Sequence, residues 1–123
     1  MKYRAAIGSF NGEYVDQHFG HTKKYYIYEF DDETGTVDFL ERRFVDTKCE
    51  CHADEGNAFS EVFEALNDVS AIVISRIGRG ATSIVENHGF VLYESTSKIE
   101  NVIQKIADSR LYEEDQWRKI ITN

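Results

Sequence analysis

The segment AIVISRIGRGA, residues 71–81, decides the fold class. Its first four residues form a continuous apolar run, which is typical of a strand buried on both faces of a parallel sheet. The glycines that follow stand where such a strand passes into a helix, a place where backbone N–H groups commonly face a bound anion. The segment therefore predicts a strand–loop–helix unit with a binding loop at the end of the strand.

A further strand and helix are predicted after this unit. Gly89 is expected to end the helix that carries Ile84 and Val85, and residues 90–93 are expected to form a short buried strand. Residues 97–100, Ser-Lys-Ile-Glu, match a capping box, in which the serine and glutamate side chains bond to the first amides of a helix. The apolar face of that helix consists of Ile99, Val102, Ile103 and Ile106.

The N-terminal half predicts three strands. Residues 3–7 form the first, and residues 25–30 are aromatic and β-branched, as strands are. Residues 37–44 return across the turn at 31–35 as an antiparallel partner. The apolar phase of this returning strand slips near Phe39-Leu40, which predicts a β-bulge there.

The order of elements gives an α/β fold. A helix with one apolar face (Phe59, Val62, Phe63, Leu66) lies between the hairpin and the 71–74 strand. Alternating strands and helices indicate a parallel sheet, to which the hairpin adds an antiparallel strand. We expect a three-layer α/β/α sandwich with a mixed sheet of about five strands. The loops over 8–20 and 78–80 leave the carboxyl ends of parallel strands, where they can meet and line a binding site.

Composition narrows the possible partners. The chain has 123 residues and a net charge of −8, which suits one globular domain and makes nucleic acid and anionic membranes poor partners. Because no segment approaches the roughly 18 apolar residues of a membrane span, and the N-terminus leads into a strand, we expect a cytoplasmic protein. In a reducing compartment, Cys49 and Cys51 are thiols or metal ligands rather than a disulfide.

Two short loops contain three of the four histidines and both cysteines. Imidazole and thiolate are the ligands that soft metals and metal–sulfur clusters prefer. The candidate ligands are His18, His21, Cys49, Cys51 and His52. Asp16 is close enough in sequence to orient His18 by accepting a hydrogen bond. The alternatives are that His18 is only bonded within its turn, and that the cysteine loop is an exposed loop that binds metal adventitiously.

The glycine loop is a candidate anion cradle. Backbone amides at Gly78 and Gly80, with the guanidinium groups of Arg76 and Arg79, can hold an anionic cluster or its organic acid. The alternative is that the glycines only permit a tight turn and that the arginines are solvated. A P-loop is excluded, because its terminal Gly-Lys-Ser/Thr is missing.

These segments resemble the dinitrogenase iron–molybdenum cofactor family, which includes NifX-like and NafY-like proteins and the C-terminal domain of NifB. The resemblance rests on VDQHFGH (15–21) followed by YYIYE (25–29), on residues 71–81, and on GFVLYE (89–94). It implies a ribonuclease-H-like fold and a small accessory protein that binds or carries an iron–sulfur or iron–molybdenum-type cluster. By the same resemblance His18 is the main cluster ligand, and Gly20 belongs to the cofactor-binding turn.

We therefore expect a non-catalytic carrier with a domain over 1–107 and a helical C-terminal tail over 108–123. No radical-SAM domain is recognisable, so a complete NifB-type synthase is not expected. Its partners would be cluster donor and acceptor proteins, and the chain itself would be a monomer or a weak homodimer. The alternative is a metal-free regulatory or interaction module of the same fold. A small hydrolase is disfavoured, because the sequence offers no nucleophile–base pair.

Overall fold

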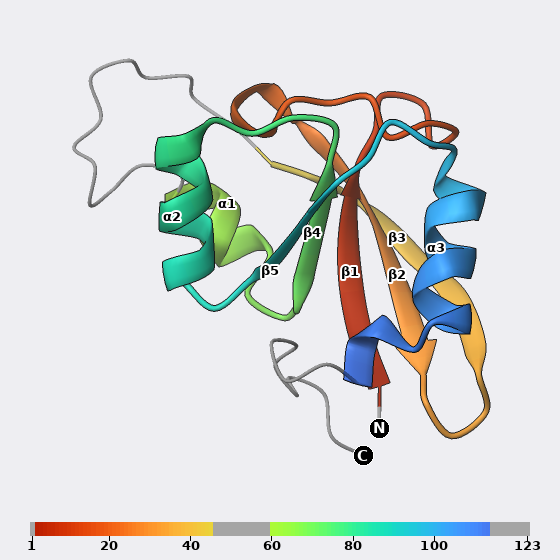
Figure 1. Cartoon of the computed structure of the whole chain (residues 1–123). Coiled ribbons are helices and arrows are strands. Elements are labelled where there is room, and N and C mark those ends of the chain that lie inside the picture. The colour runs from red at the N-terminus through yellow and green to blue at the C-terminus, as the bar shows by residue number, and fades with distance from the viewer. Residues whose placement is uncertain (1, 46–59, 114–123) are drawn as a thin grey trace.

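A computed structural model describes residues 2–45 and 60–113 of the chain (Figure 1). The strands in these ranges are β1 (Lys2–Gly8), β2 (Lys24–Asp31), β3 (Thr36–Phe44), β4 (Ala71–Ile74) and β5 (Val91–Glu94). The helices are α1 (Ser60–Ala65), α2 (Arg79–Asn87) and α3 (Ile99–Asp108), with short 3-10 turns at Phe19–His21 and Leu111–Glu113. None of these helices is long and apolar enough to cross a membrane.

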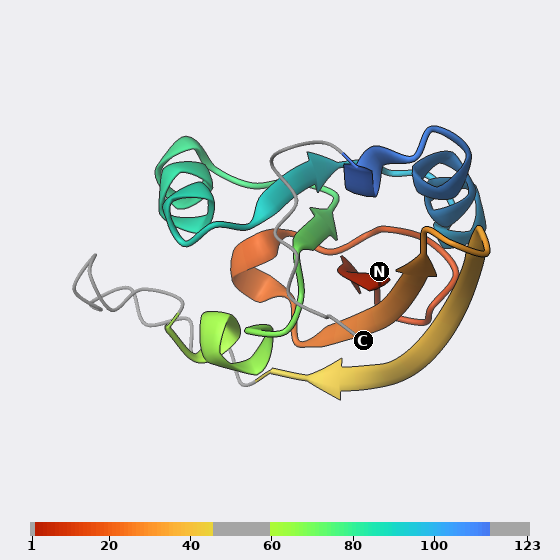
Figure 2. The ribbon, with the colours of Figure 1, turned by 90° about the horizontal axis from the view of Figure 1, so that it is seen from below.

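The strands form one sheet in the order β3-β2-β1-β4-β5. β1 pairs antiparallel with β2 and parallel with β4, and β5 extends the parallel part. Helices α1 and α2 lie on one side of the sheet and α3 lies on the other (Figures 1 and 2). The predicted three-layer α/β/α sandwich with a mixed sheet is confirmed.

Alternate residues of β1 serve the two faces, as the pleat requires. Ala6 packs into the cluster on the α1 and α2 side, together with Ile72 of β4. Ala5 and Ile7 face α3 and its neighbours, where Ile7 packs with Ile99. All of β4 is buried, as its continuous apolar run predicts.

The amphipathic helices are confirmed as well. Val62 and Phe63 of α1 are buried, as is Leu66 just after the helix, whereas Phe59 lies outside the described residues. The apolar residues of α3 are buried or half-buried against the sheet. Gly89 follows α2 with a φ of +91°, the left-handed conformation expected of a glycine that ends a helix.

The hairpin of β2 and β3 contains the predicted bulge. Ile27 lies opposite Glu41 and Tyr28 lies opposite Phe39, so Leu40 has no opposite residue on β2. Each residue of β3 after the bulge therefore faces the opposite side from the one that strict alternation would give it.

The predicted capping box at 97–100 is wrong. α3 begins at Ile99, and the preceding Lys98 makes no side-chain cap. The Ile99 amide donates to Glu13 O over 2.8 Å, and the Val15 amide donates to Ser97 O over 3.0 Å. These bonds hold the chain before α3 in an extended bridge with the 13–15 loop, so Ser97 lies outside the helix.

The last predicted strand is also less buried than expected. Phe90 is buried, but β5 runs from Val91 to Glu94 and its residues are half-buried or exposed. The reason is position, because β5 lies at an edge of the sheet and the central strands do not.

Residues beyond α3 pack on the core. Tyr112 is 2% exposed, and its ring stacks on Tyr3 at 5.2 Å and on Phe30 at 6.0 Å between centroids. The predicted helical tail from residue 114 onward lies outside the described residues, and the division after residue 107 stays a prediction.

Candidate functional site

The loop after β1 and the loop after β4 meet at one end of the sheet. The Ser75 amide donates to Gln17 O, and the Phe19 amide donates to Arg76 O, each over 2.9 Å. His18 and Arg76 thereby form a short parallel bridge beyond the named strands. The predicted meeting of the two loops is confirmed.

His18 is held by its main chain and not by its ring. Its carbonyl oxygen accepts hydrogen bonds from the His21 amide over 3.0 Å and from the Thr22 hydroxyl over 2.7 Å. Phe19 anchors the turn, because its side chain is 1% exposed and packs in the core. The imidazoles of His18 and His21 are exposed, and neither forms a hydrogen bond with another described residue.

The histidine turn packs closely against Gly8 at the end of β1. A Cβ atom at Gly8 would lie 3.1 Å from methyl groups of Ile74 and Thr22. The absence of a side chain at Gly8 therefore lets the end of β1, the end of β4 and the histidine turn approach one another. Thr22 itself is fully buried.

A buried tyrosine lies beside Thr22. Tyr25 is fully buried, and its hydroxyl has no hydrogen-bond partner among the described residues. Burial raises the pKa of Tyr25 far above its ordinary value, and the neighbouring Thr22 hydroxyl lowers it by less. At neutral pH the hydroxyl stays protonated.

The loop after β4 leads into α2, and no side chain caps the first amides of this helix. Gly78 precedes the helix without a side-chain cap, and its carbonyl oxygen accepts bonds from Thr82 N (2.9 Å) and Thr82 Oγ1 (3.0 Å). The first N–H groups of a helix have no acceptor within it and, with the helix dipole, they favour an anion. A Glu94 carboxylate oxygen accepts from the Ile77 amide over 3.1 Å and holds the loop in place.

Local geometry does not require glycine at three positions of these two loops. Gly20, Gly78 and Gly80 do not have positive φ angles, and a Cβ atom at each would meet nothing within 4 Å. Neither backbone conformation nor crowding therefore requires glycine there. Their bare backbone leaves space for a ligand to approach closely.

The two predicted arginines are available. Arg76 and Arg79 are exposed, and within residues 2–45 and 60–113 neither takes part in an ion pair. Arg76 belongs to the bridge with His18, and Arg79 is the first residue of α2. Both guanidinium groups thus extend from the segment that joins the histidine turn to the helix.

The remaining predicted ligands belong to the cysteine loop. Cys49, Cys51 and His52 lie outside the described residues. Among those described, three or more His, Cys, Asp or Glu side chains do not gather in a metal-binding group. The expected role of Asp16 is wrong, because its Oδ1 accepts from Phe10 N and Gln17 Nε2, each over 3.0 Å, and orders the loop instead of the His18 ring.

His88 lies at the C-terminal end of α2. Its Nδ1 lies 3.0 Å from Ile84 O at the end of α2, and its ring stacks on Phe63 with centroids 4.0 Å apart. A cationic ring at this position interacts favourably with the helix dipole.

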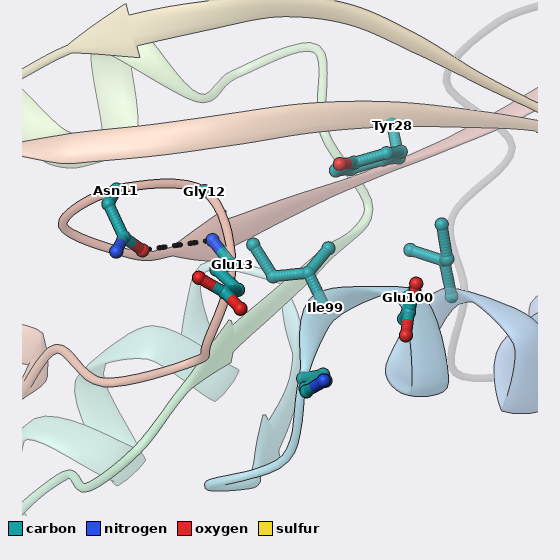
Figure 3. Close-up of a pocket in the computed structure, with 8 residues that line it drawn as sticks. Asn11, Gly12, Glu13, Tyr28, Ile99 and Glu100 are labelled. Atoms are coloured by element: carbon teal, nitrogen blue, oxygen red, sulfur yellow. Dashed lines mark hydrogen bonds between the residues drawn. The ribbon is translucent and has the colours of Figure 1, made fainter.

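A cavity of about 290 Å³ that sequence analysis missed opens beside the start of α3. It is lined by Asn11, Gly12, Glu13, Tyr28, Lys98, Ile99, Glu100 and Ile103 (Figure 3). In Figure 3 the carboxylates of Glu13 and Glu100 lie on either side of Ile99, with the Tyr28 ring above. Burial, and to a lesser degree the neighbouring Tyr26, raise the pKa of Tyr28. The lining includes none of the predicted ligand residues, and no sequence motif marked it.

Solved structures share this architecture. The crystal structure of PH0822 superposes with a TM-score of 0.66 and 18% identity, over 86% of this chain and 91% of that one. A Methanocaldococcus jannaschii protein described as a dinitrogenase superposes with a TM-score of 0.58 and 16% identity, over 89% and 91%. At these identities the likeness shows the fold.

Sequence comparison shows the family. The FeMo cofactor biosynthesis protein NifB of Frankia alni is 28% identical over 104 residues, which are 82% of this chain and 20% of that protein. NifB of Klebsiella pneumoniae is 33% identical over 89 residues, 68% of this chain and 19% of that protein. The chain thus spans about a fifth of these relatives. The family described as dinitrogenase iron–molybdenum cofactor matches residues 1–109, and the chain belongs to that family.

Proposed function

We propose that this chain is a non-catalytic carrier of an iron–sulfur or iron–molybdenum-type cluster. The cluster would be its cargo, held at the end of the sheet where the histidine turn meets the loop before α2. The observation that carries the proposal is the main-chain bridge of His18 to Arg76, which fixes an exposed imidazole beside the start of a helix. Membership of a family named for the cofactor supports it.

Each residue of this end has a role in the proposal. His18 would ligate the cluster through its exposed ring, with His21 as an auxiliary ligand from the same turn. The bare backbone at Gly20, Gly78 and Gly80 would admit the cluster closely, and the amides at the start of α2 would face its negative charge.

The arginines complete the anion cradle. Arg76 and Arg79 have no competing ion pair among the described residues, so their charge is available to an anionic cargo. Cys49, Cys51 and His52 would supply further ligands of the kind that iron–sulfur clusters prefer. Few protein ligands on exposed loops favour a cargo that is released again to an acceptor protein.

The donor set argues against a closed structural metal site. Such sites use four side-chain ligands around the metal, whereas the described part of this end contributes two imidazoles. The partners would be proteins that supply and accept the cluster in the cytoplasm.

Anaerobic reconstitution with iron and sulfide, with and without molybdate, tests the proposal by metal analysis and visible absorption. We expect the wild type to retain a stoichiometric chromophore and His18→Ala to lose most of it. His88→Ala is the matched control, since it removes an imidazole from the far end of α2 and should leave the metal content unchanged. The double variant Cys49→Ser/Cys51→Ser measures whether the thiols share in binding.

Two results would overturn the proposal. If the wild type retains no metal, the alternative of a metal-free interaction module of the same fold is favoured. If His18→Ala retains as much metal as the wild type while the thiol variant loses it, the histidine turn is not the site.

A further inference from the structure

The strand β3 leaves one edge of the sheet open. In the part of the chain that the structure describes it is the last strand, and it runs along the margin of the molecule over nine residues (Figure 2). Its side chains are mostly exposed, including Phe39 at 51% and Phe44 at 67%. A long edge strand with exposed apolar side chains presents unpaired N–H and C=O groups to another strand.

We propose that β3 pairs antiparallel with β3 of a second copy of this chain. The two-fold axis would pass between Leu40 and Glu41, and the two sheets would continue as one. This inference is independent of cluster binding, because it involves none of the residues of the proposed cluster site. It commits to one occupant because the strand is complementary to itself.

The bulge selects the register. Val37 and Phe39 face the α3 side, because they lie opposite Phe30 and Tyr28 on β2. After the bulge, Arg42 and Phe44 also face the α3 side, opposite Tyr26 and Lys24. Asp38, Glu41 and Arg43 face the other side, opposite Glu29, Ile27 and Tyr25.

Directly paired residues of neighbouring strands must point to the same face. A self-pairing of Asp38 with Arg42 would place the two side chains on opposite faces, so that register is excluded. Moving the axis by half a residue, to a point between Leu40 and Glu41, brings residues of the same face together on both sides of the bulge.

In that register three of the four kinds of pair are chemically matched. The pairs are Val37 with Phe44, Asp38 with Arg43, Phe39 with Arg42 and, next to the axis, Leu40 with Glu41 of the second copy, each occurring twice. The first three are an apolar pair, a carboxylate–guanidinium pair, and a ring with a guanidinium group, all of which stabilise antiparallel ladders. Arg43 also bonds to Asp68 at 2.7 Å and to Ala65 O at 2.8 Å within its own chain, so its guanidinium group would share these contacts with Asp38 of the second copy.

The bulge itself does not oppose this pairing. A bulge normally protects an edge because it twists the edge strand away from an incoming strand. Here the bulges of the two copies would lie next to each other at the axis, so each irregularity meets its equivalent. The other edge, β5, has four residues and ends in Glu94, and it offers no such self-match.

Sedimentation equilibrium of the full chain over a concentration series tests the proposal. We expect the wild type to associate to twice the mass of the chain. Asp38→Lys should weaken the dimer at least about tenfold, because each lysine would lie opposite Arg43 of the other copy. Glu86→Lys, which makes the same charge change on the exposed face of α2, should leave the dimer intact.

A mixing experiment tests the register. Phe39→Lys should be monomeric, because its lysine lies opposite Arg42. An equimolar mixture with Arg42→Glu should restore a heterodimer, since lysine then opposes glutamate and the remaining ring opposes the remaining guanidinium group. The proposal is overturned by a monomeric wild type, by an Asp38→Lys dimer of unchanged affinity, by loss of the dimer in Glu86→Lys, or by a mixture that stays monomeric.

Discussion

Arg43 and Asp68 join the end of the hairpin to the loop before β4 through two hydrogen bonds. Arg43 Nη1 lies 2.7 Å from Asp68 Oδ1, and Nη2 lies 3.3 Å from Oδ2. Arg43 Nη1 also donates to Ala65 O over 2.8 Å, and Arg4 of β1 donates to the same carboxylate. Strands β1 and β3 are thereby connected through one carboxylate that is 31% exposed, and Arg43 links the end of α1 to the same cluster.

Asp68→Asn should therefore destabilise the fold. It removes the negative charge from two guanidinium groups while leaving the volume unchanged, and we expect a loss of about 1–2 kcal/mol in the free energy of unfolding at pH 7. Urea unfolding followed by circular dichroism measures it. Glu86→Gln, an exposed carboxylate on α2, is the control and should change the midpoint little.

The stability difference between the wild type and Asp68→Asn should depend on pH. Burial alone would raise the pKa of Asp68, but the hydrogen bonds and charge of Arg43, with the bond from Arg4, outweigh it and hold the pKa below its usual value. Because the folded pKa is lower than the unfolded one, the stabilisation is present above the unfolded pKa, about 3.9, and is lost as pH falls through the folded pKa. The difference between wild type and Asp68→Asn should accordingly shrink below about pH 4. A difference that stays constant down to pH 3 contradicts this assignment.

Tyr25→Phe should not harm the fold. The Tyr25 hydroxyl is buried without a hydrogen-bond partner among the described residues, so its removal relieves a desolvated polar group. We expect the free energy of unfolding to stay the same or to rise by up to about 1 kcal/mol. A loss of more than about 1 kcal/mol would mean that the hydroxyl is bonded, for example to a buried water.

Gly12→Ala should be strongly unfavourable. Gly12 has a φ of +85°, and a Cβ atom there would lie 2.7 Å from the Tyr26 ring. The left-handed conformation and the clash together should cost about 1–3 kcal/mol, measured as a lower thermal midpoint. Gly20→Ala is the matched control, since its Cβ would meet nothing within 4 Å, and it should be nearly neutral.

Tyr112→Ala should show that the chain beyond α3 is part of the core. Its ring is 2% exposed and stacks on two other rings, so truncation should cost about 3–5 kcal/mol. Tyr112→Phe keeps the ring and should lose much less. Equal losses in the two variants would assign the effect to the hydroxyl instead of the stack.

Sequence periodicity predicted the layers because it records burial directly. The apolar run over 71–74 and the faces of α1 and α3 are consequences of which side chains avoid water. Even the bulge in β3 could be predicted from the sequence, since an extra residue shifts the apolar phase of an otherwise alternating strand. The order of the elements, and not periodicity, predicted that the loops after β1 and β4 meet, because both leave the carboxyl ends of parallel strands.

Features that depend on contacts with other segments of the chain could not be predicted from local sequence patterns. Ser97 has the residue spacing of a helix cap, but the bond from Val15 holds it in an extended segment. Asp16 is close to His18 in sequence, yet its carboxylate is taken by Phe10 and Gln17. The cavity beside α3 combines residues from β2, the 11–13 loop and α3, a set that no local pattern specifies.

The hydrogen bonds that join the histidine turn to the loop after β4 run from main chain to main chain. The path of both loops is therefore encoded separately from the side chains at positions 18 and 76. A cysteine or a carboxylate substituted at position 18 would have the same backbone position as the histidine. If the proposed cluster site is correct, a substitution at position 18 would therefore change the metal preference of this end without changing the main-chain path of either loop.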